Sequence, residues 1–160
     1  MPGALPQGPA SSPPPPWWAR WRSRRVIVHD QSMTPTLLPG DRLLVETGAY
    51  RERLPIVGEL IVMVDPADPR RWLVKRVAAV GPGRSVRTGS GDPGRAGFET
   101  DPTPPTFGVD SVDLPDRTVY VLGDAGGVAR DSRQFGPVPL DRVVGRVYRC
   151  YAPAERRREL

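Results

Sequence analysis

Short apolar segments separated by turn residues are the main pattern along this chain. Six segments rich in valine, leucine and isoleucine are expected to be strands: 26–29, 42–46, 58–64, 71–79, 118–122 and 143–150. The pairs Gly40-Asp41 and Gly58-Glu59 are typical of the turns between strands. The 21 prolines and 17 glycines argue against long helices. The pattern therefore predicts a mainly β fold, with antiparallel sheets curled around a small core.

The 160 residues fit one domain with polar ends and one long interruption. Residues 1–25 are rich in proline, serine and glycine and end in a tryptophan/arginine cluster, so a disordered tail is expected. The folded domain is expected over 26–152, followed by a basic tail over 153–160. Within the domain, 81–117 has little apolar periodicity, which indicates a flexible variable insertion with room for one short strand pair.

One serine and one lysine carry the candidate chemistry. Ser32 starts a Met-Thr-Pro-Thr turn, and Lys75 lies in a short apolar strand. Because side chains alternate along a strand, Lys75 shares its face with Leu73 and Val77. Burial among apolar groups lowers the pKa of a lysine and makes its amine a base. The pattern therefore predicts that Lys75 takes the proton of the Ser32 hydroxyl.

Each of these two residues also has a purely structural explanation. Serine is favoured at turns, which is sufficient reason for Ser32. A lysine on an edge strand guards against aggregation, which is sufficient reason for Lys75. A third polar block favours catalysis and comprises Gly123, Asp124, Asp131, Ser132 and Arg133. Two of its members, Asp131 and Arg133, share a face of a segment read as extended, so a structural ion pair is expected.

Three segments together resemble a known family. They are SMTPTLLPGD (Ser32 to Asp41), VKRVAAVGPG (Val74 to Gly83) and GDAGGVARDSRQFGPV (Gly123 to Val138). These segments resemble the type I signal peptidases, which are serine proteases with a Ser/Lys dyad. The resemblance runs from about Val28 to Tyr148, apart from the insertion. It is greatest to the short, unanchored branch typified by the nickel superoxide dismutase maturation proteases.

The resemblance implies a reaction and a set of site residues. Ser32 corresponds to the nucleophile and Lys75 to the general base, while the third block supports the site. The implied reaction removes an N-terminal leader or signal peptide from a precursor protein, with a small residue before the cut. The substrate is expected to bind as an added strand. The residues expected to bind it are Val28, His29, Asp30, Gln31, Met33, Leu73 and Val74.

Three residues depart from the family pattern. Many relatives have serine or glycine two positions before the nucleophile, where this chain has Asp30. A carboxylate only accepts hydrogen bonds and opposes a developing negative charge, so Asp30 must point away or the oxyanion hole rests on backbone amides. The usual asparagine and serine of the third block are Ala125 and Ala129. These departures leave open a catalytically weak or inactive relative that only binds leader peptides.

Other mechanisms have less support in the sequence. The single histidine, His29, is three residues from Ser32, whereas the members of a catalytic triad normally come from separate elements. No metal-ligand spacing and no phosphate-binding loop occur, so no metal and no cofactor are expected. The lone Cys150 is expected to be a buried thiol. A self-cleaving repressor shares the Ser/Lys layout, but it needs a DNA-binding helix pair, and this proline-rich tail cannot supply one.

Partners and location follow from charge and hydropathy. The net charge of +5 comes with no nucleic-acid-binding module, so no nucleic acid is expected. No stretch of about 20 apolar residues and no secretory signal occur. The chain is therefore expected to be cytoplasmic, or peripheral at a membrane. Weak contact with a membrane surface would be made by Trp17, Trp18, Trp21 and Arg22.

Overall fold

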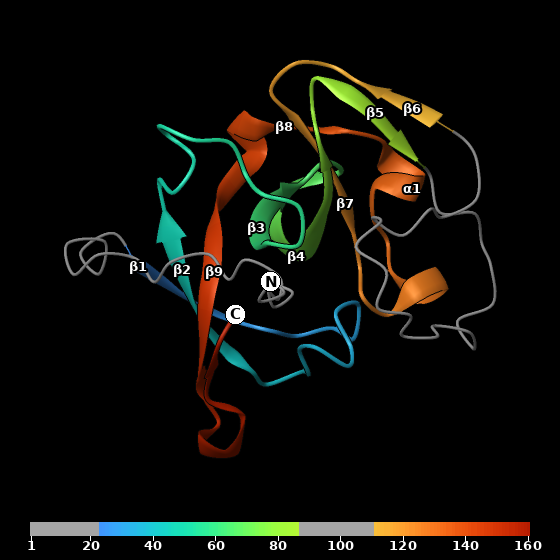
Figure 1. Ribbon diagram of the computed structural model, residues 1–160. Coiled ribbons are helices and arrows are strands. Elements are labelled where there is room, and N and C mark those ends of the chain that lie inside the picture. The colour runs from blue at the N-terminus through green and yellow to red at the C-terminus, as the bar shows by residue number, and fades with distance from the viewer. Residues whose placement is uncertain (1–22, 87–110) are drawn as a thin grey trace, which may run out of the picture.

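The computed structural model describes residues 23–86 and 111–160, which form a mainly β fold (Figure 1). The strands are β1 (Ser23–Ile27), β2 (Arg42–Thr47), β3 (Leu60–Asp65), β4 (Asp68–Val80), β5 (Gly83–Val86), β6 (Ser111–Leu114), β7 (Thr118–Leu122), β8 (Val138–Pro139), β9 (Val143–Ala152) and β10 (Arg158–Glu159). The short helical segments are η2 (Gly126–Val128), α1 (Ser132–Phe135), η3 (Leu140–Arg142) and η4 (Ala154–Arg156). The predicted fold class is confirmed.

All six strands predicted from the sequence are present, with ends shifted by a few residues. The largest shifts at a strand start are in β1, which begins at Ser23 instead of 26, and in β4, which begins at Asp68 instead of 71. At the base of the predicted insertion, β5 and β6 pair as a separate two-stranded sheet. The rest of the insertion, and the N-terminal segment with the tryptophan cluster, lie outside the described residues.

The remaining strands form one antiparallel sheet in the order β1-β2-β9-β3-β4-β7-β8, with β10 added to β9. In Figure 1, β2 and β9 run side by side, and β3 and β4 lie next to them. The interior strand β4 places Lys75 opposite Ile61 of β3, with its side chain 1% exposed. Because this side chain is buried, it is not a solvated lysine that guards a strand edge, and that explanation of Lys75 is wrong.

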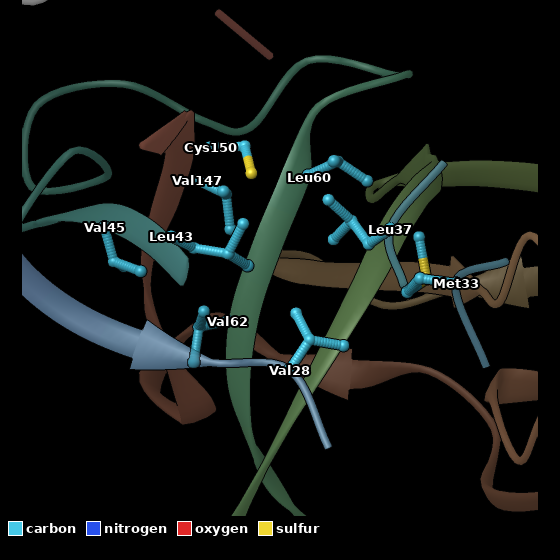
Figure 2. Packing of buried hydrophobic residues seen from close by; sticks show 9 residues of the cluster. All are labelled: Val28, Met33, Leu37, Leu43, Val45, Leu60, Val62, Val147 and Cys150. Carbon is cyan, nitrogen blue, oxygen red and sulfur yellow. The ribbon is translucent and has the colours of Figure 1, made fainter. Parts of the chain in front are cut away.

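The core consists of two apolar clusters divided between the two ends of the sheet. One cluster gathers side chains from β2, β3, β9 and the segment after β1, and Figure 2 shows its members: Val28, Met33, Leu37, Leu43, Val45, Leu60, Val62, Val147 and Cys150. The other gathers apolar residues of β3, β4, β7 and β8. Cys150 is a buried free thiol in the first cluster, as the sequence predicted. The turn after Ser32 is fastened to this cluster by Met33 and Leu37.

The C-terminal basic segment is folded against the sheet. β10 pairs with β9, and the Arg156 guanidinium donates hydrogen bonds of 2.7 and 2.9 Å to the carboxylate of Asp41, which is 1% exposed. Arg156 and Arg158 also donate to the carbonyl of Thr36. These residues were interpreted from the sequence as a basic tail, because arginine runs are usually solvated. The buried carboxylate of Asp41, 115 residues earlier, gives this run a long-range partner.

We expect Arg156→Ala to lower the free energy of unfolding by about 2–3 kcal/mol, because it leaves a buried carboxylate without its cation. The matched control is Arg157→Ala, which removes an exposed guanidinium that donates to the carbonyl of Tyr151, and it should cost less than about 0.5 kcal/mol. Urea unfolding at pH 7 measures both variants. Equal losses in the two variants would show that the Asp41 contact contributes nothing to stability.

Candidate active site

The structure brings the two candidate catalytic residues together. The Nζ atom of Lys75 lies 2.7 Å from the Oγ atom of Ser32, across 43 residues of sequence. Leu73, Lys75 and Val77 are all buried on one face of β4, which confirms the alternation expected from the sequence. Ser32 itself is half-buried at the start of a turn. A buried amine therefore meets a serine hydroxyl at hydrogen-bonding distance.

The environment of Lys75 lowers the pKa of its ammonium below the usual 10.5. Burial is the main cause, since removing a charge from water penalises the protonated form. Arg71 acts in the same direction through repulsion. The carboxylates of Asp30, Asp131 and Asp124 oppose the change by attracting the ammonium, with Asp30 the strongest of the three. Lys75 is also the only lysine among the 23 lysine and arginine residues of the sequence.

Backbone and side-chain hydrogen bonds hold the turn that carries Ser32. The Thr34 amide donates to the Gln31 carbonyl at 3.0 Å, and the Leu37 amide donates to the Met33 carbonyl at 2.8 Å. Because Met33 and Leu37 are buried in the core, the turn has two apolar anchors. The preference of serine for turns is enough to explain a serine at this position, but the structure also places the Ser32 hydroxyl against the Lys75 amine.

A salt bridge that was not predicted from the sequence links the turn that carries Ser32 to β4. Arg76 donates to both carboxylate oxygens of Asp124, at 2.9 and 2.6 Å, and Thr36 donates to the same carboxylate at 2.6 Å. The link therefore joins the nucleophile turn, the lysine strand and the third polar block. Two features of the sequence could have indicated this salt bridge: Arg76 directly follows Lys75, and Asp124 lies in the third block.

The third block supports the site through Asp131, which caps α1. Its buried carboxylate accepts hydrogen bonds from the backbone amides of Gly123 and Arg133 and forms an ion pair of 2.7 Å with the Arg133 guanidinium. The predicted ion pair is confirmed, but its setting is a helix N-terminus and not an extended segment. The Oγ atom of Ser132 accepts from the Val121 amide at 2.9 Å, so this serine fastens α1 to β7.

Gly123 lies close to both Ser32 and Lys75. A Cβ atom at this position would lie 2.2 Å from the Cβ atom of Ala129, 2.6 Å from the Ser32 carbonyl oxygen and 3.6 Å from Lys75 Nζ. Any larger residue at 123 would therefore push the Ser32 turn or the segment at Ala129 away. Ala129 is 1% exposed and packs against this glycine.

An open cleft of about 560 Å³ lies over the pair, and part of the predicted binding set lines it. The predicted members in its wall are Asp30, Gln31 and Leu73, and the wall also contains Thr34, Arg71, Ala125 and Arg130. Val28 and Met33 instead point into the core, and the exposed His29 is absent from the lining. Val74 packs against the core cluster of Figure 2, on the face of β4 opposite Lys75.

One edge of β4 is open beside this cleft. β7 pairs with β4 from Arg76 to Val80, and β3 pairs with the other edge from Trp72 to Arg76. Over 72–75, no described strand pairs with the β7-side edge. β7 ends at Leu122, and the Ala125 amide donates to the Ser32 carbonyl, so the chain runs toward Ser32 instead of continuing along this edge.

Asp30 neither points away from the site nor leaves the Ser32 amide free. Its Oδ1 atom accepts a hydrogen bond of 3.0 Å from the Ser32 backbone N–H, and its Oδ2 atom lies 3.6 Å from the Arg71 guanidinium. Burial acts to raise the pKa of Asp30, hydrogen bonds from the Ser32 hydroxyl and amide act to lower it, and the net shift is downward. The nearby positive charges of Lys75 and Arg71 add to this lowering, so the carboxyl stays ionised near neutral pH.

A buried amine against a serine hydroxyl, at the floor of an open cleft, defines the class of serine hydrolases that use lysine in place of histidine. Residues 21–92 and 94–152 match the family described as signal peptidase, peptidase S26. The chain therefore belongs to the signal peptidase family and is a serine peptidase of the signal peptidase I type.

Two curated proteins illustrate the similarity. The chain is 34% identical to the probable signal peptidase I-1 of Synechocystis sp., over 82% of this chain and 72% of that protein. It is also 34% identical to the mitochondrial ATP-independent inner membrane protease subunit 1a of Arabidopsis thaliana, over 80% of this chain and 70% of that protein. Within residues 23–86 and 111–160, the structure contains no helix long and apolar enough to span a bilayer.

We expect the Lys75 ammonium to titrate below the usual 10.5, because its burial outweighs the attraction of three carboxylates. As the pH rises through this midpoint the amine becomes neutral, so reaction at Ser32 should accelerate over the same range. Since the sequence holds one lysine, ¹³C-lysine labelling reports Lys75 alone, and the ¹³Cε chemical shift gives the midpoint directly. A midpoint at or above 10.5 would contradict the burial argument.

We expect Gly123→Ala to separate Ser32 from Lys75 and to slow labelling of Ser32 by a fluorophosphonate at least tenfold. The added Cβ should also cost about 1–3 kcal/mol of stability, as overpacking does. Gly127→Ala is the matched control, because a Cβ there meets nothing within 4 Å. Equal labelling rates in the two variants would show that the close approach at Gly123 is unimportant for the reaction.

Proposed function

We propose that this protein removes the signal or leader peptide of precursor proteins by Ser32/Lys75 acyl-enzyme chemistry. The observation that carries the proposal is the 2.7 Å contact between Lys75 Nζ and Ser32 Oγ, with the amine 1% exposed. Membership of the signal peptidase family gives the substrate class, which is a precursor protein with a cleavable N-terminal peptide. The open cleft beside the pair gives a peptide access to the hydroxyl.

The chemistry follows from the two side chains. Neutral Lys75 takes the proton of the Ser32 hydroxyl as Oγ bonds to the carbonyl carbon before the scissile bond. The tetrahedral oxyanion then collapses, the C–N bond breaks, and the Lys75 ammonium gives its proton to the leaving amine. In the second half, Lys75 takes a proton from water as the hydroxide adds to the acyl carbon. Collapse releases Ser32 Oγ, which takes the proton back from Lys75.

The substrate would bind as a strand along the open edge of β4. Residues 72–75 offer backbone donors and acceptors on that side, and Leu73 lines the cleft beside them. On the other wall the segment Asp30-Gln31 faces the same space. A peptide between these walls has its carbonyl carbon directed at Ser32. Val28 and Met33 then act indirectly, as core anchors of the segment that carries the nucleophile.

The finer assignment is to the short, unanchored branch typified by nickel superoxide dismutase maturation proteases. The resemblance of the three sequence segments supports it, including the loose third block with Ala125 and Ala129. In this assignment the enzyme works in the cytoplasm on a cytoplasmic precursor. Contact with a membrane through Trp17, Trp18, Trp21 and Arg22 is the alternative, and these residues lie outside the described structure.

The test is cleavage of two purified precursors, a nickel superoxide dismutase with its leader and an exported protein with its signal peptide. We expect one discrete new N-terminus from the wild type, and a loss of at least about a thousandfold in Ser32→Ala and in Lys75→Ala. Arg70→Ala, a change at a 92% exposed side chain on the same strand, is the matched control. Adding lipid vesicles to both reactions separates the cytoplasmic assignment from the membrane one.

One observation favours the alternative of an inactive relative that only binds leaders. The Asp30 carboxylate occupies the Ser32 amide that the oxyanion would need. If the folded wild type binds leader peptides but cuts none, with or without vesicles, the binding function replaces the proposed one. Cleavage that survives Lys75→Ala at neutral pH would instead contradict the dyad.

A further inference from the structure

The backbone N–H of Ser32 is a candidate oxyanion donor, and it is already in use. Its hydrogen bond to Asp30 Oδ1 is 3.0 Å long, an ordinary length for a formed bond. A single N–H cannot serve a carboxylate and an oxyanion equally well at the same time. The resting site is therefore one in which a side chain of the protein stands where the substrate's oxygen has to go.

The charge of Asp30 opposes the reaction in a second way. Two negative charges a few ångströms apart repel each other strongly in a partly buried site, so an oxyanion is disfavoured while the carboxylate remains. The same carboxylate is the strongest of the groups that hold the proton on Lys75, ahead of Asp131 and Asp124. In its observed position, Asp30 acts against both the base and the transition state.

The structure also offers Asp30 another partner. The Arg71 guanidinium lies 3.6 Å from Asp30 Oδ2, and the Arg71 side chain is 57% exposed. The Asp30 side chain is itself 50% exposed, so it can turn toward Arg71 without disturbing the core. Both residues line the cleft over Ser32, so a peptide entering the cleft meets them.

We propose that Asp30 is a self-inhibitory residue that occupies the oxyanion-binding amide of Ser32 and must move to Arg71 before the substrate carbonyl can react. This inference rests on the proposed Ser32/Lys75 peptidase function. The incoming carbonyl takes over the Ser32 N–H, and the displaced carboxylate strengthens its pairing with Arg71. Asp30 thus limits the rate at which the resting enzyme attacks a carbonyl that does not fill the cleft.

The test compares wild type, Asp30→Ser and Asp30→Asn by the rate at which a fluorophosphonate labels Ser32. One oxyanion donor is worth about 10²–10³ in rate, so freeing it should accelerate Asp30→Ser at least tenfold at pH 7. Asp30→Asn keeps an acceptor oxygen without the charge, so its labelling rate should fall between those of wild type and Asp30→Ser. Asp116→Ser removes an exposed carboxylate in the turn after β6 and is the matched control. Unchanged or slower labelling of Asp30→Ser would overturn the proposal.

Two further NMR measurements distinguish this role of Asp30 from a merely structural one. The Lys75 midpoint, read from the ¹³Cε shift, should be lower in Asp30→Ser than in wild type, with Arg71, Asp124 and Asp131 still present. In wild type, the Ser32 amide proton shift should titrate with the Asp30 carboxyl at acid pH. An amide that does not respond would show that the contact is absent in solution and would overturn the proposal.

Arg71→Ala completes a double-mutant cycle with Asp30→Ser. In the wild-type background it removes the alternative partner of Asp30, so labelling should slow. In the Asp30→Ser background its effect should be clearly smaller, because no carboxylate remains to be accommodated. Equal effects in the two backgrounds would contradict the role given to Arg71. Since labelling needs no leader peptide, failure of the proposed cleavage function would leave these comparisons intact.

Discussion

The burial of one amine is the constraint on which the rest of the site depends. Lys75 is 1% exposed in an interior strand, where a permanent charge is expensive and a neutral amine is tolerated. Arginine cannot meet this demand, because its guanidinium stays protonated in proteins. The composition agrees with this requirement, since the only lysine in the sequence lies at this position. The cations of the ion pairs described above, such as Arg76, Arg133 and Arg156, are arginines.

A neutral amine acts as a base only where the hydroxyl is held against it, and several contacts supply that alignment. Three kinds of contact hold the nucleophile turn: core packing of Met33 and Leu37, the Arg76–Asp124 bridge that reaches it through Thr36, and the arginines after β9. Gly123 lets the third block come close enough to touch both partners. The short distance between nitrogen and oxygen is thus a property of four separate parts of the fold.

The sequence predicted those features that depend on local pattern. Six strands, the shared face of Leu73, Lys75 and Val77, and the Asp131–Arg133 pair all follow from alternation or short spacing. The sequence could not predict ion pairs between distant residues, because charge alone does not say which arginine meets which carboxylate. Arg156 with Asp41 is the clearest case. The direction of the Asp30 side chain depends on backbone angles that residue identity does not fix, so the sequence left open whether this carboxylate points away from Ser32.

The contact between Asp41 and Arg156 also bears on how the protein is made. A ribosome produces the nucleophile turn early, and the guanidinium that neutralises its buried carboxylate emerges 115 residues later. Until then the nascent chain carries Ser32 on a turn that lacks one of its fastenings, while Lys75 is already synthesised. The complete arrangement is therefore assembled only after translation has passed β9. One fastening of the nucleophile turn thus comes from a part of the chain that is synthesised well after both Ser32 and Lys75.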